Sequence, residues 1–385
     1  MKIWGCPRYS EEKVALAPLL LNSAHDMGLP FFNGQAKRRD QIVAFDLGDR
    51  STKAVYLQRR GEQFSLVNYA LVDVPTAEKG LTPELWANHF REVAKALGVT
   101  GKSRRVTLAI GVNDAIFRQI EMPLMPPADM RQMLKFNAKT YLQQELNDYV
   151  YDCAYVLNTA GAKPAEAPKG NPAQFKQKVL VGGARRQLIE DLQNAVKQAG
   201  LVPDQIVPSV IGPVNAFELA EPEAFAKEVV ALVDVGFKNT AIIILSAGEL
   251  KLHRVVAIGG DRLTAGLAES LAIGYVEAEN IKVGMASEVQ SALEAQISPL
   301  GRELRASIDF FEHQHDRTVA QAFVCGGSAR NELVVQSLQA ELMVPCKSWN
   351  PARALQIELP PERAGEFEQV TPQLTVAIGA AASGF

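Results

Sequence analysis

The sequence predicts an α/β fold built from two duplicated lobes, each with a mixed β-sheet. The first observation is a strand-turn-strand segment at residues 42–57 that is repeated at residues 230–245. In both copies an apolar strand ends in Asp-x-Gly, and a second apolar strand follows a short turn. The second observation is length, because 385 residues exceed the roughly 250 to 300 at which single cores stop growing. Together they predict two lobes that hold one ligand between them.

The first half of the chain alternates apolar strands with amphipathic helices after this hairpin. Its expected elements are, in order, a strand at 64–72, a helix at 83–97, strands at 106–110 and 116–122, a helix near 130–145, a strand at 152–157, a loop at 158–178 rich in Ala, Pro, Gly and Lys, a strand at 179–182, a helix at 186–199 stopped by Gly200, a strand at 205–207 and a helix at 209–219.

The second half repeats the order. Its expected elements are the hairpin from Val229, a third strand at 251–258, a helical region at 262–314, a strand at 322–325, a helix at 331–342 and a last helix around 374–382. Both halves therefore begin with three strands and a helix, followed by further β and α units. This order predicts mixed sheets with helices packed on their faces.

Composition excludes several classes of protein. A net charge of -3 and a pI near 6.1 give no general attraction to nucleic acid or to an acidic membrane surface. The four cysteines, Cys6, Cys153, Cys325 and Cys346, show no C-x-x-C spacing, which indicates a reducing compartment. No apolar run approaches the ~20 residues of a membrane-spanning helix. The segment 14–21 follows two glutamates and contains Pro18, so it does not read as a secretion signal.

The two Asp-x-Gly turns have the chemistry of a phosphate site. A glycine lets the turn backbone approach a phosphate, successive N–H groups form an anion-binding concavity, and an aspartate at the strand mouth can hold Mg²⁺ through its water shell. Asp46 and Asp234 are the candidates. The alternative is that each aspartate only caps its own turn.

Three motifs resemble the superfamily of actin, heat-shock chaperones and sugar kinases. They are Asp46-Leu47-Gly48 with Ser51, Thr52 and Lys53, then Asp234-Val235-Gly236 with Thr240, then Gly326-Gly327-Ser328-Ala329-Arg330. Within it the chain resembles the PilM family, the actin-like, FtsA-related proteins of type IV pilus assembly. The blocks that select this family are Ile120-Glu121-Met122-Pro123, Ala278-Glu279-Asn280-Ile281-Lys282 and the helix 304–314 with Ile308, Asp309, Phe310 and Phe311.

The resemblance implies an actin-like ATPase fold of two duplicated mixed-sheet lobes with an FtsA-like inserted subdomain, and it covers about residues 42–382. The expected divisions are an N-terminal extension at 1–40, the first lobe at 41–103 and 179–228, the inserted subdomain at 104–178 and the second lobe at 229–385. The extension departs from the family, whose members usually begin close to the first strand.

By resemblance, ATP and Mg²⁺ occupy the cleft, with Asp46 and Asp234 as the metal carboxylates. Glu279 and Lys282, three apart on a helix, would reach the ribose and adenine, and Arg330 would stack on the base. The alternatives that involve no nucleotide are that Glu279 and Lys282 form only a surface ion pair, and that the segment with Arg330 is only a tight turn. The complete set expected to bind nucleotide is Asp46, Gly48, Ser51, Thr52, Lys53, Asp234, Gly236, Asn239, Thr240, Glu279, Lys282, Gly326, Gly327, Ser328 and Arg330. Phe237 and Lys238 depart from a glycine-rich second turn.

The implied function is that of an ATP-binding cytoplasmic scaffold or switch at the inner membrane, which binds the cytoplasmic N-terminal segment of a PilN-like protein. ATP hydrolysis is expected to be slow or negligible, because the helix at 209–219 offers Asn215 but no early Glu, Asp or Gln. An actin-like filament remains an alternative, and self-assembly stays open. A small-molecule kinase is a weaker one, because Asn113-Asp114-Ala115 reads as a hairpin turn. A chaperone is the weakest.

Overall fold

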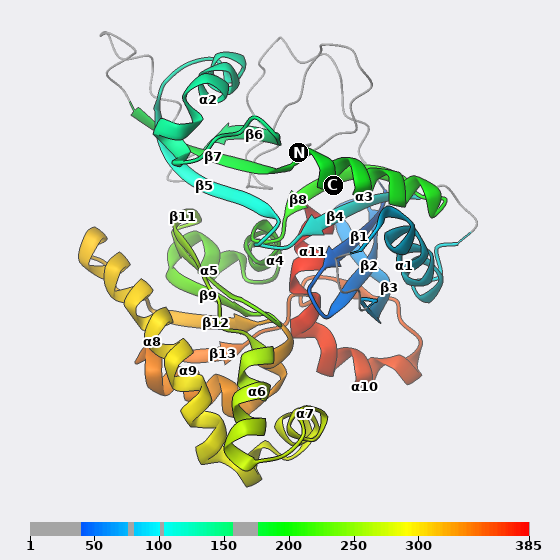
Figure 1. Ribbon diagram of the computed structural model, residues 1–385, viewed down its shortest axis with the longest axis vertical. Coiled ribbons are helices and arrows are strands. Elements are labelled where there is room, and N and C mark those ends of the chain that lie inside the picture. Colours follow the sequence, from blue (N-terminus) through cyan, green and yellow to red (C-terminus); the bar gives the residue numbers. More distant parts are fainter. Residues whose placement is uncertain (1–39, 76–80, 101–103, 157–175, 385) are drawn as a thin grey trace.

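A computed structural model describes residues 40–75, 81–100, 104–156 and 176–384 (Figure 1). The predicted N-terminal extension therefore lies outside the described residues, except for its last residue. Two large sheets and one small sheet organise the described chain. None of its described helices has the length and apolar character needed to cross a bilayer. Cys153, Cys325 and Cys346 are free thiols.

The first lobe is built on a six-stranded sheet. Its strands, in spatial order, are β14 (Gln356–Ile357), β3 (Gln63–Asp73), β2 (Ser51–Arg60), β1 (Gln41–Leu47), β4 (Arg105–Ile110) and β8 (Val202–Pro208). The central strand β1 pairs antiparallel with β2 and parallel with β4. Its residues from Ile42 to Leu47 are buried on both faces, as expected of a central strand with helices on both sides.

The second lobe repeats this arrangement with five strands. They are, in spatial order, β11 (Glu249–Val256), β10 (Thr240–Ser246), β9 (Val229–Val235), β12 (Gln321–Cys325) and β13 (Cys346–Ser348). Here β9 takes the place of β1, antiparallel to β10 and parallel to β12. Asp46 lies opposite Lys53 in the first lobe, and Asp234 lies opposite Ala241 in the second. The predicted duplication is thus present down to the position of the two aspartates.

Helices cover these sheets and connect them. They are α1 (Pro83–Ala96), α2 (Pro127–Leu142), α3 (Arg186–Gln198), α4 (Ile211–Ala220), α5 (Pro222–Lys227), α6 (Gly260–Leu271), α7 (Tyr275–Gly284), α8 (Gln290–His315), α9 (Glu332–Leu342), α10 (Pro361–Val370) and α11 (Thr375–Ala382), with short 3-10 turns η2 (Ala286–Val289), η3 (Gly327–Arg330) and η4 (Thr371–Leu374). The Thr82 hydroxyl caps α1 by accepting from the Leu85 N–H, and the Asn331 side-chain Oδ1 caps α9 by accepting from the Leu333 N–H.

A small separate sheet corrects the expected bounds of the insertion. Its order is β5 (Ala115–Pro123), β7 (Lys176–Arg185) and β6 (Tyr149–Tyr155), and it has its own apolar core with α2. The prediction of 104–178 was wrong at both ends. Strand β4 pairs with β1 in the main sheet, and β7 continues to Arg185 against β5 and β6. Residues 176–178, expected in a loop, are therefore in a strand.

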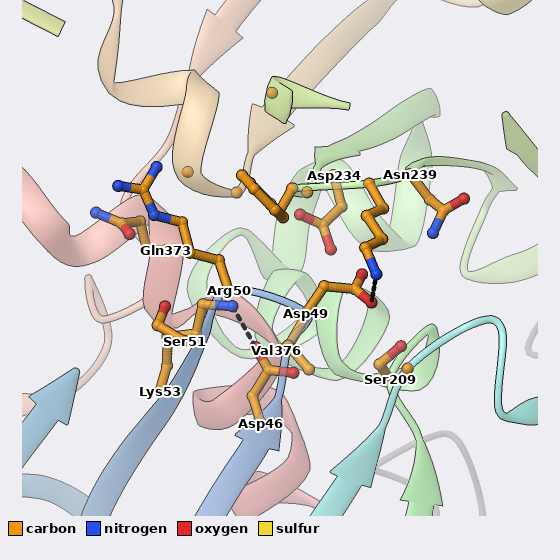
Figure 2. Close-up of a pocket in the computed structure, with 18 of the residues that line it drawn as sticks. Asp46, Asp49, Arg50, Ser51, Lys53, Ser209, Asp234, Asn239, Gln373 and Val376 are labelled. Atoms are coloured by element: carbon orange, nitrogen blue, oxygen red, sulfur yellow. Dashed lines mark ion pairs between the residues drawn. The ribbon is translucent and has the colours of Figure 1, made fainter. Parts of the chain in front are cut away.

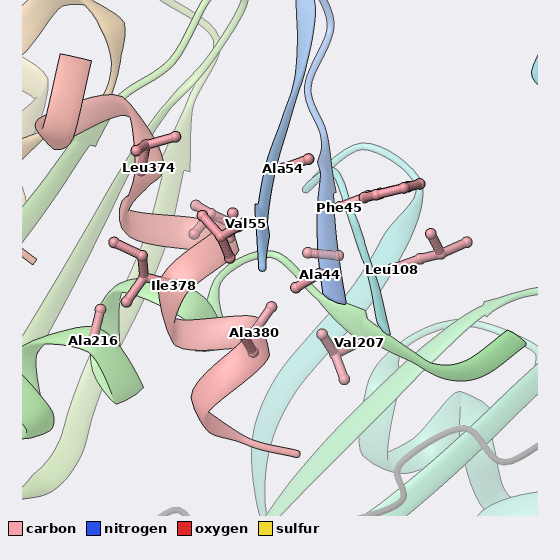
Figure 3. Close-up of a cluster of buried hydrophobic side chains, with 14 of the residues drawn as sticks. Ala44, Phe45, Ala54, Val55, Leu108, Val207, Ala216, Leu374, Ile378 and Ala380 are labelled. Atoms are coloured by element: carbon pink, nitrogen blue, oxygen red, sulfur yellow. The ribbon is translucent and has the colours of Figure 1, made fainter. Parts of the chain in front are cut away.

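The C-terminal segment corrects the expected second lobe, 229–385. Strand β14 joins the first-lobe sheet beside β3, and α11 packs against α4 and β1. Figure 3 shows Ile378 of α11 beside Ala216 of α4, and Ala380 on the side of α11 that faces strands β1 and β2 of the first lobe. The second lobe therefore ends near β13, because the apolar helix α11 is buried in the first-lobe core. The short elements β13, β14, α5 and α10 were not predicted.

Candidate nucleotide-binding site

A cavity of about 980 Å³ lies between the lobes, lined by both Asp-x-Gly turns. Ligand pockets of small molecules usually measure ≈ 300–1,000 Å³, so this volume suits a nucleotide. Figure 2 shows Asp46, Asp49 and Lys53 entering from the first lobe and Asp234 and Asn239 from the second. The cavity forms here because β1 and β9, the matching central strands, both end at its wall.

The two aspartates line the same cavity, and the charge of Asp46 affects the pKa of Asp234. Burial raises the pKa of Asp46, against the opposing charge of Lys53, whose Nζ lies 3.3 Å from Asp46 Oδ2. Burial also raises the pKa of Asp234 to about 6, and the Asp46 charge adds to this rise while Lys53 opposes it. Because each carboxylate costs the other free energy when both are ionised, the pair is suited to a counter-cation.

The donor set fits Mg²⁺ bound together with phosphate. Among the described residues no group of three or more His, Cys, Asp or Glu side chains could hold a metal ion by itself. Mg²⁺ typically keeps several waters and takes one or two carboxylates plus phosphate oxygens. Asp46 and Asp234 would be those carboxylates, and the Lys53 ammonium beside Asp46 would face the phosphates.

Two glycines at the cavity allow neighbouring atoms to approach more closely than a side chain would permit. A Cβ on Gly48 would lie 2.4 Å from Lys53 Nζ and 2.9 Å from the Ser51 carbonyl oxygen. Gly326 has a φ of +88°, and a Cβ there would lie 2.5 Å from Asp234 Oδ1. Gly326 therefore needs both its left-handed backbone and its missing side chain, so that the turn after β12 can pack on the Asp234 carboxylate.

Glu279, which is half-buried, and Lys282, which is buried, form an ion pair at the cavity wall. Lys282 Nζ lies 2.7 Å from Glu279 Oε2 and donates to Thr264 Oγ1 at 2.6 Å. Burial alone would raise the pKa of Glu279, but hydrogen bonds from Lys282 and Thr264 lower it to about 2. These contacts hold the pair in one geometry and shield it from solvent, which argues against the alternative of an ordinary surface ion pair.

Thirteen of the fifteen expected residues line the cavity. They are Asp46, Gly48, Ser51, Lys53, Asp234, Gly236, Asn239, Glu279, Lys282, Gly326, Gly327, Ser328 and Arg330. The turn that carries Gly327, Ser328 and Arg330 follows β12, and Asn331 ties it to α7 by donating to the Lys282 carbonyl at 2.8 Å. Segments far apart in the sequence thus meet at one site.

The other two expected residues point elsewhere. Thr52 is fully buried and its Oγ1 lies 2.8 Å from His89 Nε2 on α1, because successive strand side chains face opposite sides of the sheet and Ser51 and Lys53 take the cavity side. Thr240 is also fully buried and donates to the Ile258 carbonyl at 2.7 Å. Their expected role in binding nucleotide is corrected to one in holding the core and the turn.

Several lining residues were not predicted. They include Asp49, Arg50, Phe237, Lys238, Asp114 and Gln373. The first four occupy the two turns, where the charges of Asp49, Arg50 and Lys238 could have been noticed. The buried Nε2 of Gln373 has no hydrogen-bond partner among the described residues, and its Oε1 lies near Gly327. This residue follows α10, so no local pattern connects it with the turns.

The turn Asn113-Asp114-Ala115 also differs from its prediction. Strands β4 and β5 belong to different sheets, so the turn does not close a hairpin. Asn113 and Asp114 instead line the cavity. Burial raises the pKa of Asp114, the Asp49 charge adds to the rise, and Lys238 opposes it. Another carboxyl group on the first-lobe side thus lines the same cavity as Asp46.

The two lobes have matching strand orders, and an acidic turn from each lobe lines the cavity between them. These features define an actin-like ATPase fold. The predicted fold class is confirmed. The model of the family described as type IV pilus assembly protein PilM matches residues 44–385. The chain belongs to this family, as its sequence motifs predicted.

The chain is similar to several solved structures. The PilM-PilN type IV pilus biogenesis complex matches with 24% identity and a TM-score of 0.75, over 90% of this chain and 99% of that chain. The ethanolamine utilization protein EutJ from Carboxydothermus hydrogenoformans matches with 15% identity and a TM-score of 0.50, over 89% and 90%. MreB 5 of Spiroplasma citri, solved with bound AMPPNP, matches with 10% identity and a TM-score of 0.46, over 88% and 94%.

Proposed function

We propose that this protein binds ATP with Mg²⁺ in the cavity between its lobes and acts as a cytoplasmic switch or scaffold in type IV pilus assembly. The observation that supports this most is the coupled pair of carboxylates, Asp46 and Asp234, on matching turns of the two lobes. When bound, Mg²⁺ would neutralise charge on the phosphates. Lys53 would face the phosphates, and Glu279 and Lys282 the ribose and adenine.

Calorimetry with ATP and Mg²⁺ tests the proposal. We expect binding by the wild type and a loss of at least about tenfold in Asp234→Asn, since a charge-assisted contact is worth roughly 1.5–3 kcal/mol. Asp204→Asn is the matched control, because Asp204 is a buried aspartate that does not line the cavity. Absence of heat with wild-type protein would refute nucleotide binding.

Hydrolysis of ATP is expected to be slow or negligible. Asn215, the polar candidate in α4, is buried and donates to the Gly379 carbonyl at 3.2 Å, so its amide is used in holding α4 to α11. Sustained turnover well above ~1 per second by the purified protein would contradict this expectation.

The proposed partner is the cytoplasmic N-terminal segment of a PilN-like inner-membrane protein. Support comes from family membership and from the similar fold of the PilM-PilN complex. ATP would then bias which partner surface is presented, by no more than its differential affinity for the two states. A pull-down with a PilN-like peptide, with and without ATP and Mg²⁺, tests this. Sedimentation with ATP tests the filament alternative.

One observation favours a second candidate, a small-molecule kinase. Asp114 lines the cavity with a raised pKa, as a catalytic base for a substrate hydroxyl would. Phosphorylation of a panel of hexoses by the wild type, lost in Asp114→Asn, would establish it.

A further inference from the structure

The two turns also contact each other across the mouth of the cavity. Arg50, in the turn between β1 and β2, donates from Nη1 to Glu279 Oε1 at 2.7 Å. Its guanidinium lies 5.7 Å from the ring centre of Phe237, in the turn between β9 and β10. Lys238, the next residue of that turn, places Nζ 3.7 Å from Asp49 Oδ1. The lobes therefore meet at three contacts beside the cavity.

The charges of these contacts are complementary. The first-lobe turn carries the acid Asp49 and the base Arg50. In the second lobe, Lys238 pairs with Asp49 and Glu279 pairs with Arg50. Phe237 and Lys238 are the residues by which the second turn departs from a glycine-rich loop. Their side chains thus make contacts to the other lobe that glycines could not make.

Glu279 retains room for a ligand within this arrangement. Its Oε2 is held by Lys282 and Thr264, and its Oε1 by Arg50. An ionised carboxylate offers about four acceptor sites, and three are used here. One lone-pair site therefore remains for a hydroxyl donor, while the three partners fix the direction in which the carboxylate points.

We propose that Arg50 and Lys238 are positioning residues that clasp the two lobes over a nucleotide in the cavity. Arg50 orients Glu279 from the opposite lobe, and Lys238 holds the phosphate-facing turn through Asp49. This inference rests on the proposed function and adds to it the means by which the lobes are held together.

The clasp is expected to be weak enough to open. The side chains of Arg50 and Lys238 are 51% and 57% exposed. Exposed ion pairs contribute little, so each pair should change nucleotide release by no more than about fivefold, and less at high salt. Opening would therefore admit and release nucleotide without partial unfolding.

Release of a fluorescent ATP analogue in stopped flow tests the clasp. Lys238→Glu should speed release about threefold to fivefold, because it places like charges opposite Asp49. Addition of Asp49→Lys should restore the slow rate, which a merely structural role of Lys238 would not predict. Lys227→Glu, an exposed lysine on α5 outside the cavity, is the matched control and should release at the wild-type rate.

A second measurement does not need nucleotide. Spin labels at Glu92→Cys on α1 and Glu269→Cys on α6 report the separation of the lobes. Lys238→Glu should lengthen or broaden this distance in the empty protein, and Asp49→Lys should reverse the change. If the distances stay unchanged, the clasp is refuted. If wild-type protein binds no ATP, the proposed function fails, and the distances alone decide the clasp.

Discussion

The Asp234 carboxyl lines the same cavity as the Asp46 carboxylate, and the charge of Asp46 influences its proton equilibrium. Burial and the Asp46 charge raise its pKa from 3.8 to about 6 in the folded protein. An acid whose pKa is raised by folding favours the folded state at low pH. That contribution is fully present below 3.8 and is lost as the pH rises through about 6. The metal-free site is therefore a source of instability at neutral pH.

Asp234→Asn should stabilise the metal-free protein at pH 8 by about 1–3 kcal/mol. The reason is that the neutral amide avoids the free-energy cost of removing an ionised carboxylate from water on folding. The gain should shrink as the pH falls from about 6 toward 4, where the wild-type carboxyl is protonated. Urea unfolding across this pH range measures it. A gain that is the same at all pH values would show that charge is not its cause.

Helices α4 and α11 cross more closely than side chains would allow. A Cβ on Gly379 would lie 1.8 Å from the Gly212 carbonyl oxygen, and one on Gly212 would lie 2.7 Å from the Val376 Cα. Both helices are buried in the middle of the molecule (Figure 1). The sequence of α11, rich in Ala and Gly, is thus explained by its close packing rather than by helix propensity.

Gly379→Ala should destabilise the protein by about 1–3 kcal/mol or more, because the added methyl forces two backbones apart. Gly365→Ala in α10 is the control, since nothing lies within 4 Å of its Cβ position. A helix-interior alanine there should be neutral or stabilise by up to about 1 kcal/mol. Equal losses in both variants, measured by urea unfolding, would contradict the close crossing.

At the scale of the whole molecule, the inserted sheet touches both lobes. Lys178 on β7 places Nζ 3.0 Å from Glu249 Oε1 on β11, the edge strand of the second lobe. The rings of Phe117 and His253 meet edge to face at 5.5 Å between β5 and β11. Burial, with the nearby Arg118 charge, lowers the pKa of His253 to about 4, so this contact stays uncharged at neutral pH. Any rotation of the second lobe would therefore change what the insertion contacts.

Lys178→Glu should weaken the effect of ATP on binding of a PilN-like peptide. It places a second negative charge next to Glu249, so the two carboxylates repel each other where the insertion meets the second lobe. The ratio of peptide affinities with and without ATP should move toward one. Lys176→Glu, an exposed lysine at the start of the same strand, should leave the ratio as in the wild type. An unchanged ratio in both variants would place the coupling elsewhere.

Local patterns predicted most of the strands and helices, and thirteen of the fifteen residues expected at the site line the cavity. These patterns could do so because apolar runs and Asp-x-Gly turns act over a few neighbouring residues. Thr52 was misplaced because side chains along β2 alternate between the two faces of the sheet, so Thr52 points away from the cavity that Ser51 and Lys53 line. Strand β14 was missed because two residues show no periodicity, and only the β3 edge makes them a strand.

The amino-acid order by itself determined the two lobes, their paired acidic turns and the family, since each is written within a short stretch of chain. Only the tertiary structure decided which charges meet across the cleft. Arg50 and Glu279 are separated by 229 positions. Such a pair depends on how the lobes are rotated and packed, and no local propensity encodes that rotation.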